Sequence, residues 1–192
     1  METLNSLPAC SADIAKMKIL IVDDEPANVA LLEAMLRCSG YTQIKTLTDS
    51  RVAIATCKTF QPDLVLLDLM MPYVDGFAVL AGIRSEVGDM FLPVIVLTAD
   101  VNEKTKLRAL RASANDFLTK PLDQTEVLVR IGNLLETRKL HLLLDNQRSA
   151  FEDAVRSRTA ELRTALAELE DVKACFLKHQ NSSTEFFSTA TR

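Results

Sequence analysis

Short apolar runs alternate with longer stretches of helical periodicity along the first two thirds of the chain. The runs contain few polar residues, which is typical of parallel strands that are covered on both faces. Strands that alternate with helices over short connections indicate βαβ units, and so a five-stranded parallel sheet in a doubly wound α/β fold. The expected strands lie at 17–24, 44–48, 63–68, 92–100 and 116–121.

Residues that favour helix ends mark the limits of the expected helices. Pro26 suits the first turn of a helix, and Gly40 follows the last turn of the same helix. We expect Ser50 and Asn102 to cap two further helices, because their side chains accept hydrogen bonds from free backbone N–H groups. A fifth helix is expected to begin near Asp123. The expected helices lie at 26–39, 51–60, 76–86, 103–114 and from about 123 onward.

The last third of the chain has a different pattern. All five glycines lie between Gly40 and Gly132, and the last proline is Pro121. An uninterrupted helical pattern follows, with apolar residues at heptad spacing and polar residues between them. Such a narrow apolar seam favours a coiled coil, although Arg148 and Arg158 interrupt it. The seam consists of Leu144, Arg148, Phe151, Val155, Arg158, Leu162, Ala165, Leu169, Val172 and Phe176.

These patterns divide the chain into four expected segments. An N-terminal tail at 1–16 precedes an α/β domain at 17–138, and a coiled-coil helix at 139–180 continues the last helix of that domain. A flexible tail follows at 181–192. The seam predicts a parallel homodimer, because a single solvated helix, which is the alternative, would leave an apolar stripe in water.

Composition and charge narrow the classes of protein that fit. The net charge of −4 predicts no general attraction to nucleic acid or to an anionic membrane. No apolar run reaches the ~18 residues of a membrane span. The four cysteines are scattered without a metal-binding spacing, which fits the reducing cytoplasm. We therefore expect a cytoplasmic protein with no nucleic-acid or membrane partner.

Polar residues stand where the expected strands end. Asp23 and Asp24 follow the first strand, Asp68 ends the third, Thr98 ends the fourth, and Lys120 follows the fifth. The carboxyl ends of parallel strands meet at one edge of a sheet, so these residues are expected to share one cleft. Taken singly, each has an ordinary explanation as a loop, a helix cap or a surface turn.

The expected cleft has the composition of a metal and phosphoryl site. Three carboxylates repel one another unless a cation lies among them, and Mg²⁺ prefers oxygen ligands of this kind. Lys120 adds a positive charge for a phosphoryl oxygen, and Thr98 adds a hydroxyl group. A carboxylate in such surroundings is a plausible nucleophile toward phosphorus, giving an acyl phosphate.

The segments ILIVDDE, LVLLDLMMPYVDG, VIVLTA and NDFLTKP together resemble the receiver domain of bacterial two-component response regulators. The resemblance covers about 17–138. It implies a flavodoxin-like fold with strand order 2-1-3-4-5 and phosphotransfer from a sensor histidine kinase. By the same resemblance Asp68 is the phosphoacceptor. Asp23, Asp24 and the backbone carbonyl of Met70 would join Asp68 as ligands of Mg²⁺.

The resemblance also assigns the residues that respond to phosphorylation. Thr98 would be the switch hydroxyl and Lys120 the phosphate-pairing lysine, with a cis peptide bond before Pro121. Phe117 stands where the family places its switch aromatic residue. The family often has tyrosine there, so this chain keeps the ring and lacks the hydroxyl group.

The helical extension resembles the linkers that join receivers to HD-GYP, GGDEF or histidine kinase output domains, but no motif of these domains is present. His141 and His179 lack the acidic neighbour of a phosphorylated kinase histidine. We therefore expect a response regulator that transmits its state through a dimeric coiled coil. We expect no enzyme activity beyond its own phosphotransfer and dephosphorylation. The alternative is the N-terminal regulatory part of a larger signalling enzyme, such as a cyclic di-GMP phosphodiesterase or cyclase.

Overall fold

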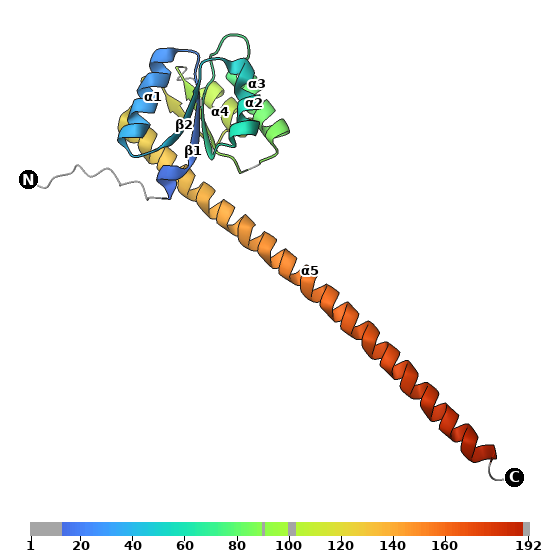
Figure 1. Ribbon diagram of the computed structural model, residues 1–192. Coiled ribbons are helices and arrows are strands. Elements are labelled where there is room, and N and C mark those ends of the chain that lie inside the picture. Colours follow the sequence, from blue (N-terminus) through green and yellow to red (C-terminus); the bar gives the residue numbers. More distant parts are fainter. Residues whose placement is uncertain (1–12, 90, 100–102, 190–192) are drawn as a thin grey trace, which may run out of the picture. The chain divides into compact units, whose positions relative to one another are not determined.

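The computed structural model describes residues 13–89, 91–99 and 103–189 (Figure 1). Residues 1–12 of the expected N-terminal tail therefore lie outside the described residues, as does the expected cap Asn102. The chain separates into two units, Met1–Leu142 and Leu143–Arg192. This division lies a little beyond position 138, where the sequence pattern placed the end of the α/β domain.

A five-stranded parallel sheet forms the centre of the first unit, with strand order β2-β1-β3-β4-β5. This arrangement confirms the predicted α/β class and the flavodoxin-like strand order. The two central strands β3 and β4 are buried along their whole length, as their apolar sequences predict. The strands are β1 (Lys18–Val22), β2 (Gln43–Leu47), β3 (Leu64–Asp68), β4 (Val94–Thr98) and β5 (Asp116–Thr119).

Helices cover both faces of the sheet. Helices α1 and α5 pack on one face, and α2, α3 and α4 pack on the other. The helical elements are η1 (Ile14–Lys16), α1 (Pro26–Cys38), η2 (Ser50–Val52), α2 (Ala53–Phe60), α3 (Gly76–Gly82), η3 (Ile83–Val87), α4 (Glu103–Arg111) and α5 (Gln124–Thr189).

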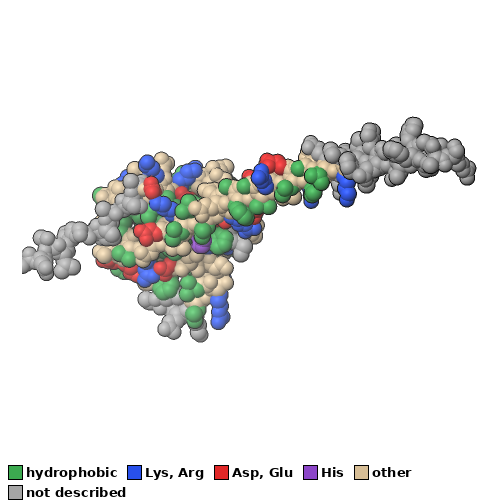
Figure 2. Space-filling view, turned by 90° about the horizontal axis from the view of Figure 1, so that it is seen from below, with side chains coloured by type: hydrophobic (Ala, Val, Ile, Leu, Met, Phe, Trp, Pro, Cys, Tyr) green, Lys and Arg blue, Asp and Glu red, His purple; other side chains and the backbone are tan. Residues whose placement is uncertain are grey.

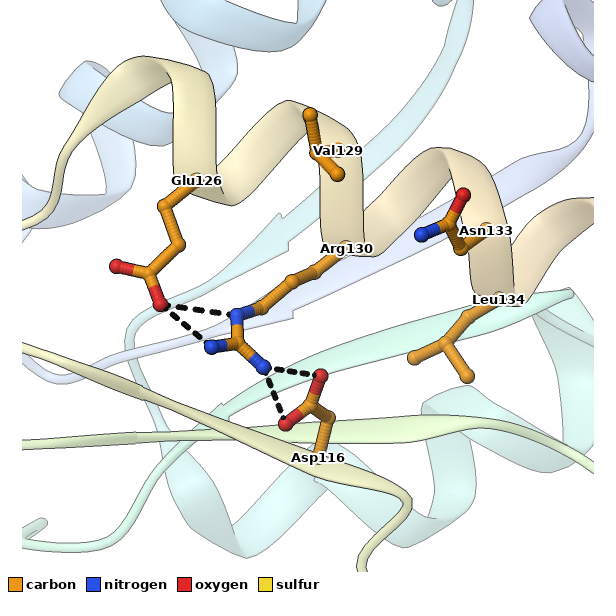
Figure 3. A pocket seen from close by; sticks show the side chains of 6 residues that line it. All are labelled: Asp116, Glu126, Val129, Arg130, Asn133 and Leu134. Atoms are coloured by element: carbon orange, nitrogen blue, oxygen red, sulfur yellow. Dashed lines mark hydrogen bonds and ion pairs between the residues drawn. The ribbon is translucent and has the colours of Figure 1, made fainter.

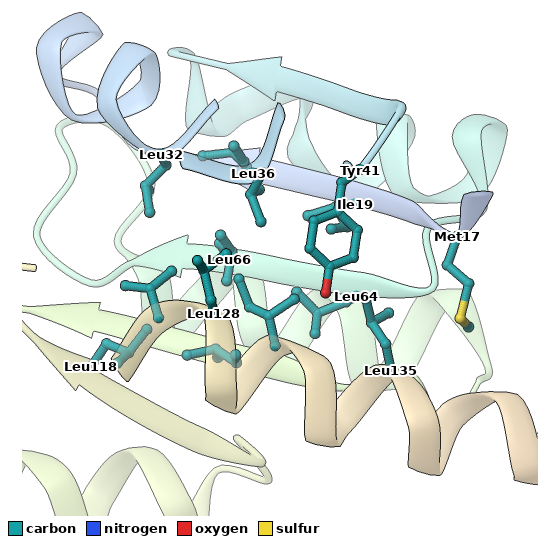
Figure 4. Close-up of a cluster of buried hydrophobic side chains, with 14 of the residues drawn as sticks. Met17, Ile19, Leu32, Leu36, Tyr41, Leu64, Leu66, Leu118, Leu128 and Leu135 are labelled. Carbon is teal, nitrogen blue, oxygen red and sulfur yellow. The ribbon is translucent and has the colours of Figure 1, made fainter. Parts of the chain in front are cut away.

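Alternate side chains of each strand enter two separate cores, because successive residues of a strand point to opposite faces. Leu64 and Leu66 of β3 face α1 and α5 (Figure 4), whereas Val65 and Leu67 face α2, α3 and α4. Each of these side chains is fully buried. The continuous apolar run of β3 thus serves two cores at once, and the strand has no polar residue until Asp68.

The first helix begins and ends at the residues that the sequence indicates. Pro26 occupies its first turn, and its missing N–H group would have no partner inside the helix anyway. At the other end Gly40 adopts a φ of 94°, a conformation that glycine adopts without steric penalty. The backbone N–H of Tyr41 then donates to the carbonyl of Leu36 and closes the helix.

The predicted cap at Ser50 is wrong. The carboxylate of Asp49 caps the turn instead, accepting a hydrogen bond from the backbone N–H of Arg51. Ser50 lies within this turn and is buried. Its hydroxyl group donates to the carbonyl of Pro72 at 3.0 Å and accepts from the N–H of Val74. The serine therefore braces the loop after β3 rather than starting α2.

The helix predicted at 76–86 is not a continuous α-helix. Asp75 caps its first turn by accepting a hydrogen bond from the N–H of Ala78. The α-helical part ends at Gly82, and a π-helical turn, η3, follows. A Cβ atom on Gly82 would lie 2.2 Å from Cδ1 of Ile54, so α2 and α3 approach closely at this position.

The second unit is a single helical segment, the continuation of α5 as far as Thr189. It passes position 180, where the sequence pattern placed the end of the coil. The described seam residues Leu144, Phe151 and Leu162 are more than half exposed. Val155, Ala165 and Leu169 are exposed too, and Figure 2 shows hydrophobic side chains along this segment. The side chains of Val172 and Phe176 lie outside the described residues.

The two arginines of the seam pair with glutamates of their own helix. Nε of Arg148 lies 2.8 Å from Glu152, and Nη1 of Arg158 lies 2.7 Å from Glu161. All four side chains are exposed, so these pairs contribute little to stability. Within the described part of the chain, no helix is both long and apolar enough to cross a membrane.

Replacement of Leu66 by alanine tests the packing of the core. This side chain is fully buried between β3 and the helices α1 and α5, so Leu66→Ala should lower the free energy of unfolding by about 2–5 kcal/mol. Urea denaturation of the intact chain measures the change. Leu31→Ala on the exposed side of α1 is the control and should alter stability by about 0.5 kcal/mol at most. Equal effects of the two substitutions would contradict the packing described here.

Candidate functional site

Three carboxylates meet at the carboxyl edge of the sheet. Asp23 follows β1, and Asp68 ends β3, the strand that pairs with β1. With Asp24 they offer oxygen atoms that all lie within 4.8 Å of one another. Asp23 and Asp68 are buried, whereas Asp24 is partly exposed. The fold thus brings together residues 45 positions apart through one strand pairing, as the sequence pattern predicts.

Lys120 binds two of these carboxylates at once. Its Nζ lies 2.8 Å from Oδ2 of Asp23 and 2.8 Å from Oδ1 of Asp68. The residue follows β5, its backbone N–H donates to the carbonyl of Thr98, and its peptide bond to Pro121 is cis. Burial by itself would lower the pKa of Lys120, but its hydrogen bonds to the two carboxylates outweigh burial and raise this pKa. The lysine is therefore a fixed positive charge.

Burial dominates the ionisation of Asp68. The loss of water around its carboxylate raises the pKa of Asp68, and the negative charge of Asp23 raises it further. The ammonium group of Lys120 and the N–H of Met70, 3.1 Å from Oδ2, partly offset this rise. The single positive charge of Lys120 therefore does not balance the negative charges of the three carboxylates. A hard cation with oxygen ligands, such as Mg²⁺, fits this donor set.

The side chain of Asn28 holds Asp23 in place, and this residue was not among those singled out in the sequence. Its amide group donates to both oxygens of Asp23, at 3.0 and 3.2 Å. The backbone N–H of Glu25 donates to Oδ1 of the same carboxylate at 2.9 Å. Asn28 lies in the first turn of α1, just after Pro26. An amide side chain at that place in a helix that follows a strand-end aspartate is the signal that could have revealed it.

The loop after β3 approaches the backbone of Asp68 so closely that it requires glycine. A Cβ atom on Gly76 would lie 2.2 Å from the carbonyl oxygen of Asp68 and 2.7 Å from Cα of Leu69. The N–H of Gly76 donates to the carbonyl of Leu69, which closes the loop. The side chain of Met70 projects from this loop and is 75% exposed. The assignment of its backbone carbonyl to a metal ion stays a prediction.

Thr98 and Phe117 lie on the two neighbouring strands beyond β3. Thr98 ends β4, which pairs with β3, and is almost fully buried. Phe117 lies on β5 and is partly buried against the core that contains α4 residues. The structure thus places the two expected switch residues on adjacent paired strands. Their response to phosphorylation stays a prediction.

A separate hollow lies between β5 and α5, and it contains none of the predicted metal, phosphoacceptor or switch residues. Arg130 crosses it, with Nη1 2.7 Å from Asp116 and Nη2 2.7 Å from Glu126 (Figure 3). The hollow has a volume of about 380 Å³ and is lined by Asp116, Glu126, Val129, Arg130, Asn133 and Leu134. The three charged side chains are already paired with one another, so the strand-end cluster remains the better candidate site.

Comparison with known proteins agrees with this geometry. The family model of the response regulator receiver domain matches residues 19–132. Response regulator PleD of Caulobacter vibrioides is 37% identical over 131 residues, which are 68% of this chain and 28% of PleD. The DNA-binding dual master transcriptional regulator RpaA of Synechocystis sp. is 39% identical over 118 residues, which are 62% of this chain and 48% of RpaA. The chain thus spans less than half the length of either relative.

One of the similar solved structures contains a metal ion. The receiver domain of a sensor histidine kinase from Pseudomonas aeruginosa matches with a TM-score of 0.58 at 30% identity. The match covers 63% of this chain and 98% of that domain. That structure holds a magnesium ion coordinated in its active-site cleft.

Replacement of Gly76 by alanine tests the close approach of the loop. The new Cβ atom would meet backbone atoms, which cannot move aside as a side chain can, so stability should fall by about 1–3 kcal/mol. Gly132→Ala in α5 is the matched control, because a Cβ atom there meets nothing within 4 Å and should stabilise the helix by up to about 1 kcal/mol. Urea denaturation measures both changes. A stabilising effect of Gly76→Ala would refute the described geometry.

Proposed function

This chain belongs to the response regulator receiver family, and on that basis we propose that it accepts a phosphoryl group from a sensor histidine kinase on Asp68. One observation supports the proposal above the others. Asp68 ends a central strand, lies within reach of two further carboxylates, and forms an ion pair with Lys120. Such a site provides the nucleophile and the positive charge that phosphoryl transfer requires.

The proposed reaction is an in-line displacement at phosphorus. A carboxylate oxygen of Asp68 attacks the phosphorus atom of a phosphohistidine, the new O–P bond forms, and the P–N bond to the imidazole breaks. The imidazole nitrogen keeps the electron pair of that bond and takes up a proton. The product is an acyl phosphate on Asp68.

The phosphoryl oxygens carry negative charge, and the site has to supply positive charge that offsets it. Asp23, Asp24 and Asp68 would hold Mg²⁺, which when bound offsets the negative charge of these oxygens. Lys120 pairs with Oδ1 of Asp68 before transfer and would pair with a phosphoryl oxygen afterwards. Asn28 keeps the carboxylate of Asp23 oriented for metal binding, since it donates to both of its oxygens.

We propose that phosphorylation then acts on Thr98 and Phe117. The hydroxyl group of Thr98 would donate to a phosphoryl oxygen, which would draw the end of β4 toward Asp68. Phe117 would move into the space that Thr98 leaves. The support is their position, since Thr98 ends the strand next to β3 and Phe117 packs beside residues of α4.

The extension of α5 is proposed to form a parallel coiled-coil dimer that carries the change onward. Its described seam residues are exposed in a single chain, and a second copy would cover them. Burial of a leucine or phenylalanine side chain contributes about 1.5–3 kcal/mol before the loss of conformational entropy. The glutamate partners of Arg148 and Arg158 would keep these charges paired at the seam.

Replacement of Asp68 by asparagine tests the phosphoacceptor. The amide is a much poorer nucleophile, so Asp68→Asn should accept no phosphate from acetyl phosphate in the presence of Mg²⁺, as measured by intact-protein mass spectrometry. Lys120→Ala should still accept phosphate but change conformation less. Asp145→Asn removes an exposed carboxylate of α5 and should react like the native chain. Stoichiometric labelling of Asp68→Asn would place the acceptor elsewhere.

Substitutions in the seam test the dimer. Sedimentation should show a dimer for the native chain and a much weaker one for Leu162→Asp with Leu169→Asp, because two charges per chain would enter an apolar seam. Ser157→Asp with Thr164→Asp adds the same charges outside the seam and should leave the dimer intact. A Leu162→Cys chain should crosslink to its own copy if the helices are parallel. A native chain that sediments as a monomer would rule the coil out.

A further inference from the structure

Helix α5 is attached to both edges of the sheet within the first unit. At the carboxyl edge it begins just after Lys120, which binds Asp23 and Asp68. At the opposite edge Arg138 of α5 lies within ion-pair distance of two other carboxylates, those of Asp63 and Asp89. This second attachment lies one turn before the end of the unit at Leu142.

Arg138 is a buried charge with an incomplete set of partners. Its side chain is almost fully buried, and its Nη1 donates to Oδ1 of Asp89 at 3.0 Å while Nη2 donates to Oδ2. Nε is buried and has no hydrogen-bond partner among the described residues, and Oδ1 of Asp63 lies 4.0 Å from it. Burial raises the pKa of Asp89, but the hydrogen bonds and charge of Arg138, with the N–H of Phe91 and the charge of Arg84, outweigh burial and hold this pKa below its usual value. The pair therefore stays ionised.

Asp63 and Asp89 precede the strands β3 and β4. The other ends of these two strands carry residues of the candidate site at the carboxyl edge. Asp63 directly precedes β3, and it binds the backbone of Lys18 twice, through its N–H at 2.7 Å and its carboxylate at 2.8 Å. Asp89 lies in the segment before β4 and accepts from the N–H of Phe91. The ring of Phe91 lies 4.5 Å from that of His141, one turn beyond Arg138. Arg138 thus joins α5 to the beginnings of β3 and β4.

A second arginine ties the same segment to the end of α4. Arg84, in the π-helical turn, donates from Nη1 to the carbonyl of Leu92 at 2.7 Å. Its Nη2 donates to the carbonyl of Ser113, just past α4, also at 2.7 Å. The segment before β4 is therefore held to the end of α4 by Arg84 and to α5 by Arg138.

We propose that Arg138 is a positioning residue, the pivot through which movement of α5 at the phosphorylated edge reaches the helical extension. The inference rests on the proposed phosphorylation of Asp68. Transfer of a phosphoryl group changes what Lys120 binds, and so shifts the chain that leads into α5. A helix is stiff over a few turns, so a shift of its first residues rotates it about a later point at which it is fixed, which is Arg138. Without the buried Arg138 pair this part of α5 would yield, and the shift would be absorbed inside the domain.

Hydrogen exchange of the intact chain tests the pivot. Exchange is followed by mass spectrometry of peptides, with and without beryllofluoride, which mimics a phosphoryl group on aspartate. In the native chain both the peptides around Asp68 and Lys120 and those at 139–150 should respond. In Arg138→Gln the first group should respond as in the native chain, and the response at 139–150 should be lost. Lys139→Gln is the control, since it removes a neighbouring charge from an exposed pair with Asp13, and it should behave like the native chain.

If Arg138 only stabilises the domain, the peptides at 139–150 still respond in Arg138→Gln. A response at 139–150 that survives in Arg138→Gln overturns the pivot, as does a native chain that responds at Asp68 but not at 139–150. No response at Asp68 in the native chain would instead refute the proposed function. Asp89→Asn breaks the same pair without changing α5, and it decides the question if Arg138→Gln does not fold.

Discussion

The contact of Lys120 with two carboxylates is the interaction on which the site depends. Asp23 and Asp68 are buried side by side, and buried like charges repel strongly unless a cation lies between them. Lys120 supplies that cation from the end of β5, so the ion pairs also join three strands at one edge of the sheet. In the proposed reaction this contact would change, because the carboxylate of Asp68 loses its negative charge when it becomes an acyl phosphate and Lys120 would pair with a phosphoryl oxygen. The same side chain would then both hold the cluster together and respond to the reaction.

The sheet makes this arrangement possible by burying its central strands on both faces. Leu64 to Leu67 divide between two cores, and this packing fixes the position at which Asp68 emerges. The opposite edge has its own charged network around Arg138, which uses carboxylates that precede the strands rather than follow them. The domain thus carries one buried charge cluster at each edge, with a rigid apolar layer between them.

The apolar runs and their polar ends predicted most of the fold and the main site residues. The place of Asp68 in the cluster was predictable because polar residues follow several strands in the same way, and together they form a signal that none of them gives alone. Ser50 and Arg138 were not, because their partners, Pro72 and Asp89, are distant in the sequence and nothing local identifies them. The π-helical turn after Gly82 was missed for a similar reason, since its residues have an ordinary helical pattern. Heptad spacing revealed the exposed seam, but spacing alone does not identify what covers it.

The close approach at Gly76 divides the loop after β3 into two kinds of position. Gly76 has backbone atoms where a side chain would begin, whereas Tyr73, a few residues earlier, is 79% exposed. Replacements at Tyr73 that tolerate its positive φ would leave the backbone of the loop in place, whereas any side chain at Gly76 would displace it. The exposed surface of the loop can therefore be redesigned independently of the backbone around Asp68, although both share one short segment of chain.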